Sequence, residues 1–328
     1  MPNLNSVQAK VDAWQRRTPP VAVAFAVNKK FGDDSLGLMV VALGWYGFLA
    51  IYPLLLVVVT VLGYVGVSSL GSGLVQTLHQ FPVVGNQFNP EHAGHNLHGS
   101  IAGLVIGLVG LVYGATGVMQ TAQTAMAQAW NVPKFDRPGF VPRLGRSLLG
   151  LIVIGGSFVV NAAIGAYATG SSEAPWERVL ALIGMLILNA LAYFGAFRVL
   201  TPKEVSTRSL LPGAIFGAVG FTTLITVGSG LVDHQLRHSS STYGQFGAVI
   251  GLVGFLLLLG RISLFGAELN PVLARHLWPR ALVARNLTDA DRAVLRAQAN
   301  ETRQHADSVV DVGFSVDDSV APASETPT

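Results

Sequence analysis

Hydrophobic residues in this chain fall in long unbroken runs, and polar residues gather in the short segments between them. A helix of about 20 apolar residues crosses a bilayer. The pattern therefore predicts an all-α polytopic membrane protein, with a six-transmembrane-helix bundle between N-terminal interfacial helices and a disordered acidic C-terminal tail. The predicted spans cover residues 37–67, 100–130, 144–168, 179–200, 210–232 and 244–268.

The flanking segments have patterns of their own. Residues 1–36 place apolar side chains such as Trp14 at helical spacing, which indicates amphipathic helices on the membrane surface. A packed helix of a cytosolic cap is the alternative. Residues 276–305 predict a cytoplasmic basic helix, which Thr288 and Asp291 open like a capping box. Residues 306–328 contain five acids and no Lys or Arg, so we expect a disordered tail.

Composition supports the membrane class. Hydrophobic residues make up 51% of the 328 positions before the 37 glycines are counted, and charged residues only 12%. Soluble domains have about 45–50% apolar residues with glycine included, and about 25% charged residues. A soluble fold could not bury that much apolar surface, whereas a bilayer covers it.

Lysine and arginine give the predicted orientation. Of the 21 such residues, 18 lie in both termini and in alternate loops, two lie in the other loops, and Arg261 lies inside the last span. Cytoplasmic loops carry the excess of positive charge. We therefore expect a multi-pass protein with both termini in the cytoplasm.

Catalytic patterns are missing from the sequence. The chain has no cysteine, which excludes disulfides, thiol catalysis and cysteine-based metal sites. It lacks the motifs of serine hydrolases, zinc proteases and P-loop proteins. A metal-dependent nuclease needs clustered ligands, and the predicted cytoplasmic side has only His276 and His305. We expect no enzyme activity, cofactor, metal or nucleic-acid partner.

One group of histidines leaves a metal site open as an alternative. His92, His95 and His98 would place three imidazoles on one helical stripe, and neutral imidazole is a good metal ligand. Nearby Pro90 and Gly94 oppose a stable helix. The segment, which also contains His79, is predicted to be a solvated loop.

Two charges in the last predicted span are the first candidates for function. Arg261 and Glu268 are seven residues apart, which is about two turns and 10.5 Å of rise, so they share one helix face. A direct or water-bridged pair is within reach. Asn161 and Asn189 would complete a polar cluster if their spans converge. A structural role, or a place for Glu268 at the cytoplasmic interface, is the alternative.

Other candidates follow from their position. Pro53 removes a backbone donor inside the first span and predicts a kink. Gln120 lies in the polar half of the second span. Gly213-x-x-x-Gly217 indicates close helix packing. Three arginines beside span ends are expected to contact anionic lipid: Arg143, Arg146 and Arg275.

Three stretches carry a family resemblance. Leu43–Leu56 reads LGWYGFLAIYPLLL, Gly110–Val132 reads GLVYGATGVMQTAQTAMAQAWNV, and Tyr243–Leu273 contains YGQFGAV and GAELN. Together they resemble the YihY/BrkB family of bacterial inner-membrane proteins, once mislabelled "ribonuclease BN". The resemblance implies six spans, cytoplasmic termini, a bacterial plasma-membrane location and a role in envelope integrity. Some members are suspected of moving envelope lipids. Arg261 departs from the family pattern, so its role is not inherited.

We therefore predict a non-enzymatic transporter or flippase-like factor for an anionic lipid, glycolipid or envelope precursor. Arg261 would bind the headgroup, Glu268 would poise that arginine, and kinking at Pro53 would gate a groove between spans 1, 2, 5 and 6. The alternative is a non-transporting scaffold that binds envelope-assembly proteins through its basic surface or tail. The predicted substrate contacts are Arg261, Glu268, Asn161, Asn189, Gln120 and Tyr243.

Overall fold

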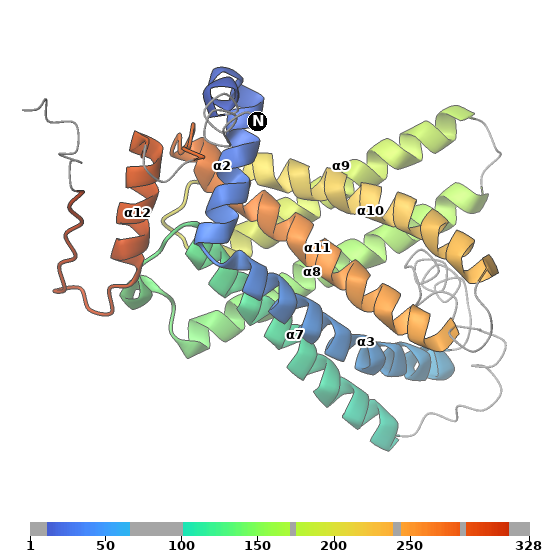
Figure 1. Ribbon diagram of the computed structural model, residues 1–328. Coiled ribbons are helices and arrows are strands. Elements are labelled where there is room, and N and C mark those ends of the chain that lie inside the picture. Colours follow the sequence, from blue (N-terminus) through green and yellow to red (C-terminus); the bar gives the residue numbers. More distant parts are fainter. Residues whose placement is uncertain (1–11, 66–100, 171–174, 239–243, 283–286, 315–328) are drawn as a thin grey trace, which may run out of the picture.

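The computed structural model describes residues 12–65, 101–170, 175–238, 244–282 and 287–314, and the regular elements in these ranges are helices (Figure 1). Two shorter helices, α2 (Pro19–Asp33) and α12 (Asp289–Glu301), accompany the long ones, with 3₁₀ turns η1 (Lys134–Asp136) and η2 (Thr207–Leu210). The long helices are α3 (Leu36–Val65), α7 (Ile101–Ala129), α8 (Phe140–Gly170), α9 (Pro175–Leu200), α10 (Leu211–His238) and α11 (Gly244–Ala274).

Length and composition make this a helical polytopic membrane protein, as predicted. Five of the described helices are long and apolar enough to cross a bilayer. A sixth crossing is counted if α2 and the first part of α3, which meet at 74°, form one bent span. Large apolar side chains stand outward on these helices, for example Ile106 on α7 and Ile152 on α8, each 69% exposed. Acyl chains can cover such faces without cost, because they are as apolar as the side chains.

The six long helices pack as a closed ring. Each of the helices α3, α7, α8, α9 and α10 packs on the long helix that follows it in the chain. The last long helix, α11, packs on α3 and so closes the ring. Glycines allow the close approaches. An added Cβ at Gly114 of α7 would lie 2.9 Å from the Ala50 backbone of α3, and one at Gly110 would lie 2.8 Å from the Pro53 ring. Pro53 therefore lies inside a continuous α3 and packs on α7.

The α10–α11 seam is the tightest of these contacts. An added Cβ at Gly213 would lie 2.0 Å from the carbonyl oxygen of Gly266. The Gly213 N–H donates to Asn270 Oδ1 at 2.7 Å, so a side chain of α11 caps the first turn of α10. Gly217 packs on Tyr193 of α9. The predicted packing role of Gly213 and Gly217 is confirmed.

Helix α2 lies across one end of the bundle, and α12 lies beyond it at the same end (Figure 1). The first and last described segments are both found there. In the helical turn before α2, Gln15 is buried and its Nε2 donates to the Arg280 carbonyl at 2.6 Å, while Trp14 is 59% exposed. This end of the molecule, with α2, α12 and the ends of α7 and α11, is called the polar end below.

Several predictions concern residues outside the described ranges. They are residues 1–11 of the N-terminal segment, the last two residues of the predicted span 37–67, the loop histidines, the first residue of the predicted span 100–130, Tyr243, residues 283–286 of the predicted basic helix, and the tail from residue 315. The backbone of Asn161 lies in α8, but its side chain is not among those described.

Replacing Gly213 by alanine should strongly destabilise the bundle, because the added methyl group would overlap the Gly266 carbonyl. Overpacking of this kind costs about 1–3 kcal/mol. Thermal unfolding in detergent would show a lower Tm. Gly155→Ala in α8 is the matched control, because nothing lies within 4 Å of an added Cβ there. Equal Tm values for the two variants would contradict the described α10–α11 seam.

Candidate functional site: a buried ion cluster beside a central cavity

The GAELN stretch of α11 places each of its residues in a tight contact. Gly266 meets the Gly213 backbone, and Ala267 is fully buried in the core. Glu268 points toward α2, and Asn270 caps α10. The stretch is therefore the point where α11 is joined to α2 on one side and to α10 on the other.

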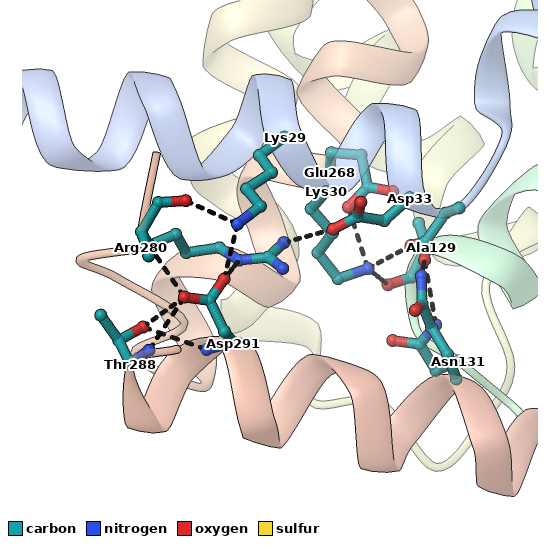
Figure 2. A network of polar contacts seen from close by, with 12 residues as sticks. Lys29, Lys30, Asp33, Ala129, Asn131, Glu268, Arg280, Thr288 and Asp291 are labelled. Carbon is teal, nitrogen blue, oxygen red and sulfur yellow. Dashed lines mark hydrogen bonds and ion pairs between the residues drawn. The ribbon is translucent and has the colours of Figure 1, made fainter. Parts of the chain in front are cut away.

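Lys30 of α2 is the centre of a buried ion cluster. Its Nζ lies 3.1 Å from Glu268 Oε2, donates to Asp34 Oδ2, and donates to the Ala129 carbonyl of α7 at 2.7 Å (Figure 2). The side chains of Lys30 and Glu268 are 0% exposed, and that of Asp34 is 1% exposed. We call Lys30, Asp34 and Glu268 the Lys30 cluster. It ties α2, α7 and α11 together through ionisable side chains that are buried.

Arg261 does not take part in this cluster. It lies on the same face of α11 as Glu268, as the seven-residue spacing predicts, and this face turns toward α2. There the guanidinium lies 6.0 Å from the Phe31 ring centre and 5.6 Å from that of Phe265, two rings that stack on each other. Arg261 is exposed, and among the described residues no acid lies within ion-pair distance of it. The structure thus pairs Glu268 with Lys30 and leaves Arg261 on the outer surface.

Helix α12 supports the cluster from outside. Asp34 Oδ1 accepts hydrogen bonds from Gln298 Nε2 at 2.8 Å and from Asn131 Nδ2 at 3.3 Å. Asn131 also donates to Glu301, which forms an ion pair of 2.6 Å with Arg137. Asp34 is therefore held by an ammonium group and two amides.

A second ion group fixes α12 to α2. Asp291 accepts from Lys29 Nζ at 2.9 Å and from Arg280 Nε at 2.8 Å, and its side chain is 1% exposed (Figure 2). It also closes the predicted capping box with Thr288, which the structure confirms. Burial alone would raise the pKa of Asp291, but hydrogen bonds from the Ala281 N–H, Lys29 and Thr288 outweigh it and hold the pKa well below the ordinary 3.8. We call this group the Asp291 latch.

A cavity of about 300 Å³ lies inside the ring of helices. All six long helices contribute to its lining, which is mostly apolar. Its polar side chains include Asn189, whose Nδ2 bonds Thr222 at 3.2 Å, and Tyr193, whose hydroxyl is 3.0 Å from that of Ser263. Leu264 lines one end of the cavity, and Glu268 follows it one helical turn later on α11. The Lys30 cluster therefore lies directly beyond that end.

The remaining predicted residues lie apart from one another. Asn189 faces the cavity, whereas Glu268 faces α2, so they form two sites. Arg143 of α8 donates to the Gln120 carbonyl at 2.9 Å and to Thr124, and so joins α8 to α7. Arg275 donates to the Trp130 carbonyl at 3.1 Å and lies 5.3 Å from the centre of that ring. Arg146 is half-buried.

Sequence reasoning missed Lys30 as the partner of Glu268. A signal was present. The buried stripe of α2 is Ala22, Ala26, Val27 and Phe31, and Lys30 falls on it at helical spacing. A lysine on an apolar stripe needs a buried partner, and Glu268 is the only acid inside a predicted span.

Among the described residues, no group of three or more His, Asp or Glu side chains is placed to hold a metal ion.

Comparisons with known proteins give relatives over most of the chain. The family "Virulence factor BrkB" matches residues 27–287. The chain is 24% identical over 252 residues to "Putative ribonuclease-like protein YfkH" of Bacillus subtilis, covering 71% of this chain and 88% of that protein. It is 24% identical over 290 residues to "Inner membrane protein YhjD" of Escherichia coli, covering 80% and 84%. No solved structure matches the chain.

The Asp291 latch predicts a pH-dependent contribution to stability. Since the pKa of Asp291 is depressed in the folded protein, its ionised form stabilises the fold above pH 3.8, and this contribution is lost as the pH falls toward the lower folded value. Asp291→Asn keeps a capping side chain but removes the charge. It should cost about 1.5–3 kcal/mol at pH 7.

The measurement is thermal unfolding in detergent between pH 7 and pH 3. The difference between wild type and Asp291→Asn should be constant down to about pH 4 and shrink below it. Asp289→Asn is the matched control, because Asp289 lies in the same helical turn with an exposed side chain. A difference that grows toward acid pH would contradict the latch.

Proposed function

The chain belongs to the virulence factor BrkB family of membrane proteins, and from that premise we propose that it moves an anionic lipid or lipid-linked envelope precursor between the leaflets of the membrane. The relative named an inner membrane protein supports a location in the bacterial inner membrane. In this proposal the protein is a transporter and catalyses no reaction. The substrate's charged group stays at the surface of the bundle while its apolar chain uses the interior.

The central cavity is the observation that carries this proposal. Ligand cavities have volumes of about 300–1,000 Å³ and are lined mainly by apolar side chains with a few polar groups. The volume of this cavity lies at the lower limit of that range, and its lining is likewise mostly apolar with a few polar side chains. Packed interiors hold few voids larger than a water molecule. A partly open apolar space of this size, lined by six helices, therefore favours an apolar guest such as part of an acyl chain.

The α3–α11 seam is the proposed route into the cavity. Leu43 and Gly47 of α3 and Gly260 of α11 line the cavity and also meet across this seam. An added Cβ at Gly260 would lie 3.6 Å from Leu43 Cβ. Gly44 receives the side chain of Leu257 in the same seam. Contacts between glycine and leucine have no directional bonds to break, so the seam can part more readily than one held by buried ions.

Arg261 lies immediately beside this route, because it follows Gly260 in α11. Its exposed guanidinium carries a charge that no described acid neutralises. Phosphate is a natural partner for such a fork of donors. The two aromatic rings beneath it fix its position next to α2. An anionic headgroup bound there would place its chain at the α3–α11 seam.

The structure changes two parts of the transport mechanism that the sequence predicts. Glu268 is engaged by Lys30, so we no longer assign it the role of poising Arg261. The groove between spans 1, 2, 5 and 6 is replaced by a cavity to which α8 and α9 also contribute. Pro53 remains a proposed bending point of α3, the helix that forms one side of the seam.

A disulfide across the seam tests the route. In the double variant Leu43→Cys/Gly260→Cys the two Cβ atoms would be about as far apart as disulfides require. The chain has no other cysteine, so the bond can form only there within one molecule. Oxidation should stop the movement of fluorescent anionic lipid between the leaflets of reconstituted vesicles. Reduction should restore it.

The two single-cysteine variants are the controls for this bond, since each has the same substitution and no partner. Movement that continues at the same rate in the oxidised double variant would rule out this seam as the route.

Arg261→Gln tests the headgroup site. The variant should lose most of the preference for an anionic over a zwitterionic lipid, because the charge is removed and the side chain remains polar. Arg261→Lys should keep part of the preference, since it keeps the charge but not the planar fork. The measurement is the ratio of the two transfer rates in vesicles. Unchanged lipid transfer in Arg261→Gln, or an unchanged envelope phenotype in Arg261→Ala cells, would count against the proposal.

A further inference from the structure

The Lys30 cluster has more negative than positive ionisable groups. Two carboxylates, Asp34 and Glu268, share the single ammonium group of Lys30, and all three side chains are at most 1% exposed. An unbalanced charge that is buried away from water is very costly, and such a group is commonly neutralised by a proton. The count of charges at this site is therefore itself a reason to expect a proton in the cluster.

Among the described residues, the surrounding charges do not supply a second cation. On α2, Lys29 pairs with Asp291. Between α2 and α12, Arg280 pairs with Asp33 and Asp291 (Figure 2). Where α7 meets α12, Glu301 is matched by Arg137. Helix α10 contributes the uncharged N–H of Gly213, which donates to Asn270 of α11. Arg275, the residue after α11, donates to the Trp130 carbonyl and lies against the Trp130 ring.

The hydrogen bonds indicate which carboxylate holds the proton. Asp34 accepts three hydrogen bonds, from Lys30, Gln298 and Asn131. Glu268 has Lys30 at ion-pair distance, yet neither of its oxygens accepts a hydrogen bond from the described part of the chain. A buried acid without donors is the one that gains by being neutral.

We infer that Glu268 is a proton-binding site and that exchange of its proton opens and closes the α3–α11 seam. The second half of this inference rests on the proposed function, whereas the first half does not. The ligand is a proton passed between the Glu268 carboxyl group and water at the polar end. No other bond forms or breaks.

The geometry connects this site to the seam in two ways. Helix α2 leads into α3 within three residues, so a change at Lys30 or Asp34 acts on the start of α3. Along α11, Glu268 lies about two turns from Gly260, the glycine of the seam. When Glu268 loses its proton, it competes with Asp34 for Lys30, and the crossing of α2 over α11 changes.

The proton site is tested first by infrared spectroscopy of the purified full-length protein. At neutral pH the wild type should show the carbonyl stretch of a protonated carboxylic acid, shifted in heavy water. Glu268→Gln should lose this band. Asp34→Asn should lose it too, because one acid and one base then remain and Glu268 can ionise against Lys30. Glu301→Gln, which removes a glutamate that is already paired with Arg137, should keep it.

These variants separate the inference from a merely structural role. A band that persists in both Glu268→Gln and Asp34→Asn would overturn the site, and so would a wild type without a band. If Glu268→Gln fails to fold, Asp34→Asn carries the test, since its side chain keeps the size and the hydrogen bonds to Gln298 and Asn131.

Coupling is tested in vesicles with an imposed pH gradient. The wild type should move anionic lipid several-fold faster with the gradient in one direction than without it, whereas Glu268→Gln should respond to neither direction. A wild type that moves lipid at a rate independent of pH would overturn the coupling and leave the proposed function standing. A wild type that shows the infrared band but moves no lipid would overturn the proposed function and leave the proton site standing. Dependence on sodium in place of protons would overturn the proton as the ligand.

Discussion

The contact between Lys30 and Glu268 is the constraint on which the rest of the polar end depends. Within a bilayer no hydrophobic force draws helices together, so close packing and polar contacts decide which helices meet. Lys30 reaches α11 through Glu268, α7 through the Ala129 carbonyl and its own helix through Asp34. Removing one partner of a buried pair typically costs about 3–5 kcal/mol, because the other charge is left alone. This one side chain therefore fixes α2 across the end of the bundle.

The ring of helices is held differently. Its seams consist mainly of glycines that meet backbone or side chains of the next helix, as at Gly114 and Ala50 or at Gly213 and Gly266. Such contacts join the helices closely at the seams, while the six helices together line a partly open cavity. The ion pairs, which resist separation, therefore lie at the polar end, and the apolar contacts, which part more easily, lie in the ring. The proposed movement of a lipid chain involves only the apolar contacts of the ring.

The sequence predicts the long helices well and the partners of their polar residues less well. Apolar runs locate the spans because the bilayer imposes their length, and the seven-residue spacing correctly places Arg261 and Glu268 on one face. It cannot show which helix that face meets. The crossing of α2 is a tertiary choice, and it brings Lys30 from the other end of the chain to Glu268. Likewise, nothing in the local pattern of α9 shows that Asn189 faces a cavity.

The distance along the chain between Lys30 and Glu268 has a consequence for how the protein is made. Chains are synthesised from the N-terminus, so α2 is made before the six long helices are inserted. The last of them then enters with an acid that an apolar helix does not tolerate well by itself. Among the described residues, the cation at ion-pair distance from that acid is Lys30 of α2. Insertion of the final helix is thus linked to a correctly placed α2, and a ribosome that stops before α11 leaves Lys30 with Asp34 as its acidic partner and without Glu268.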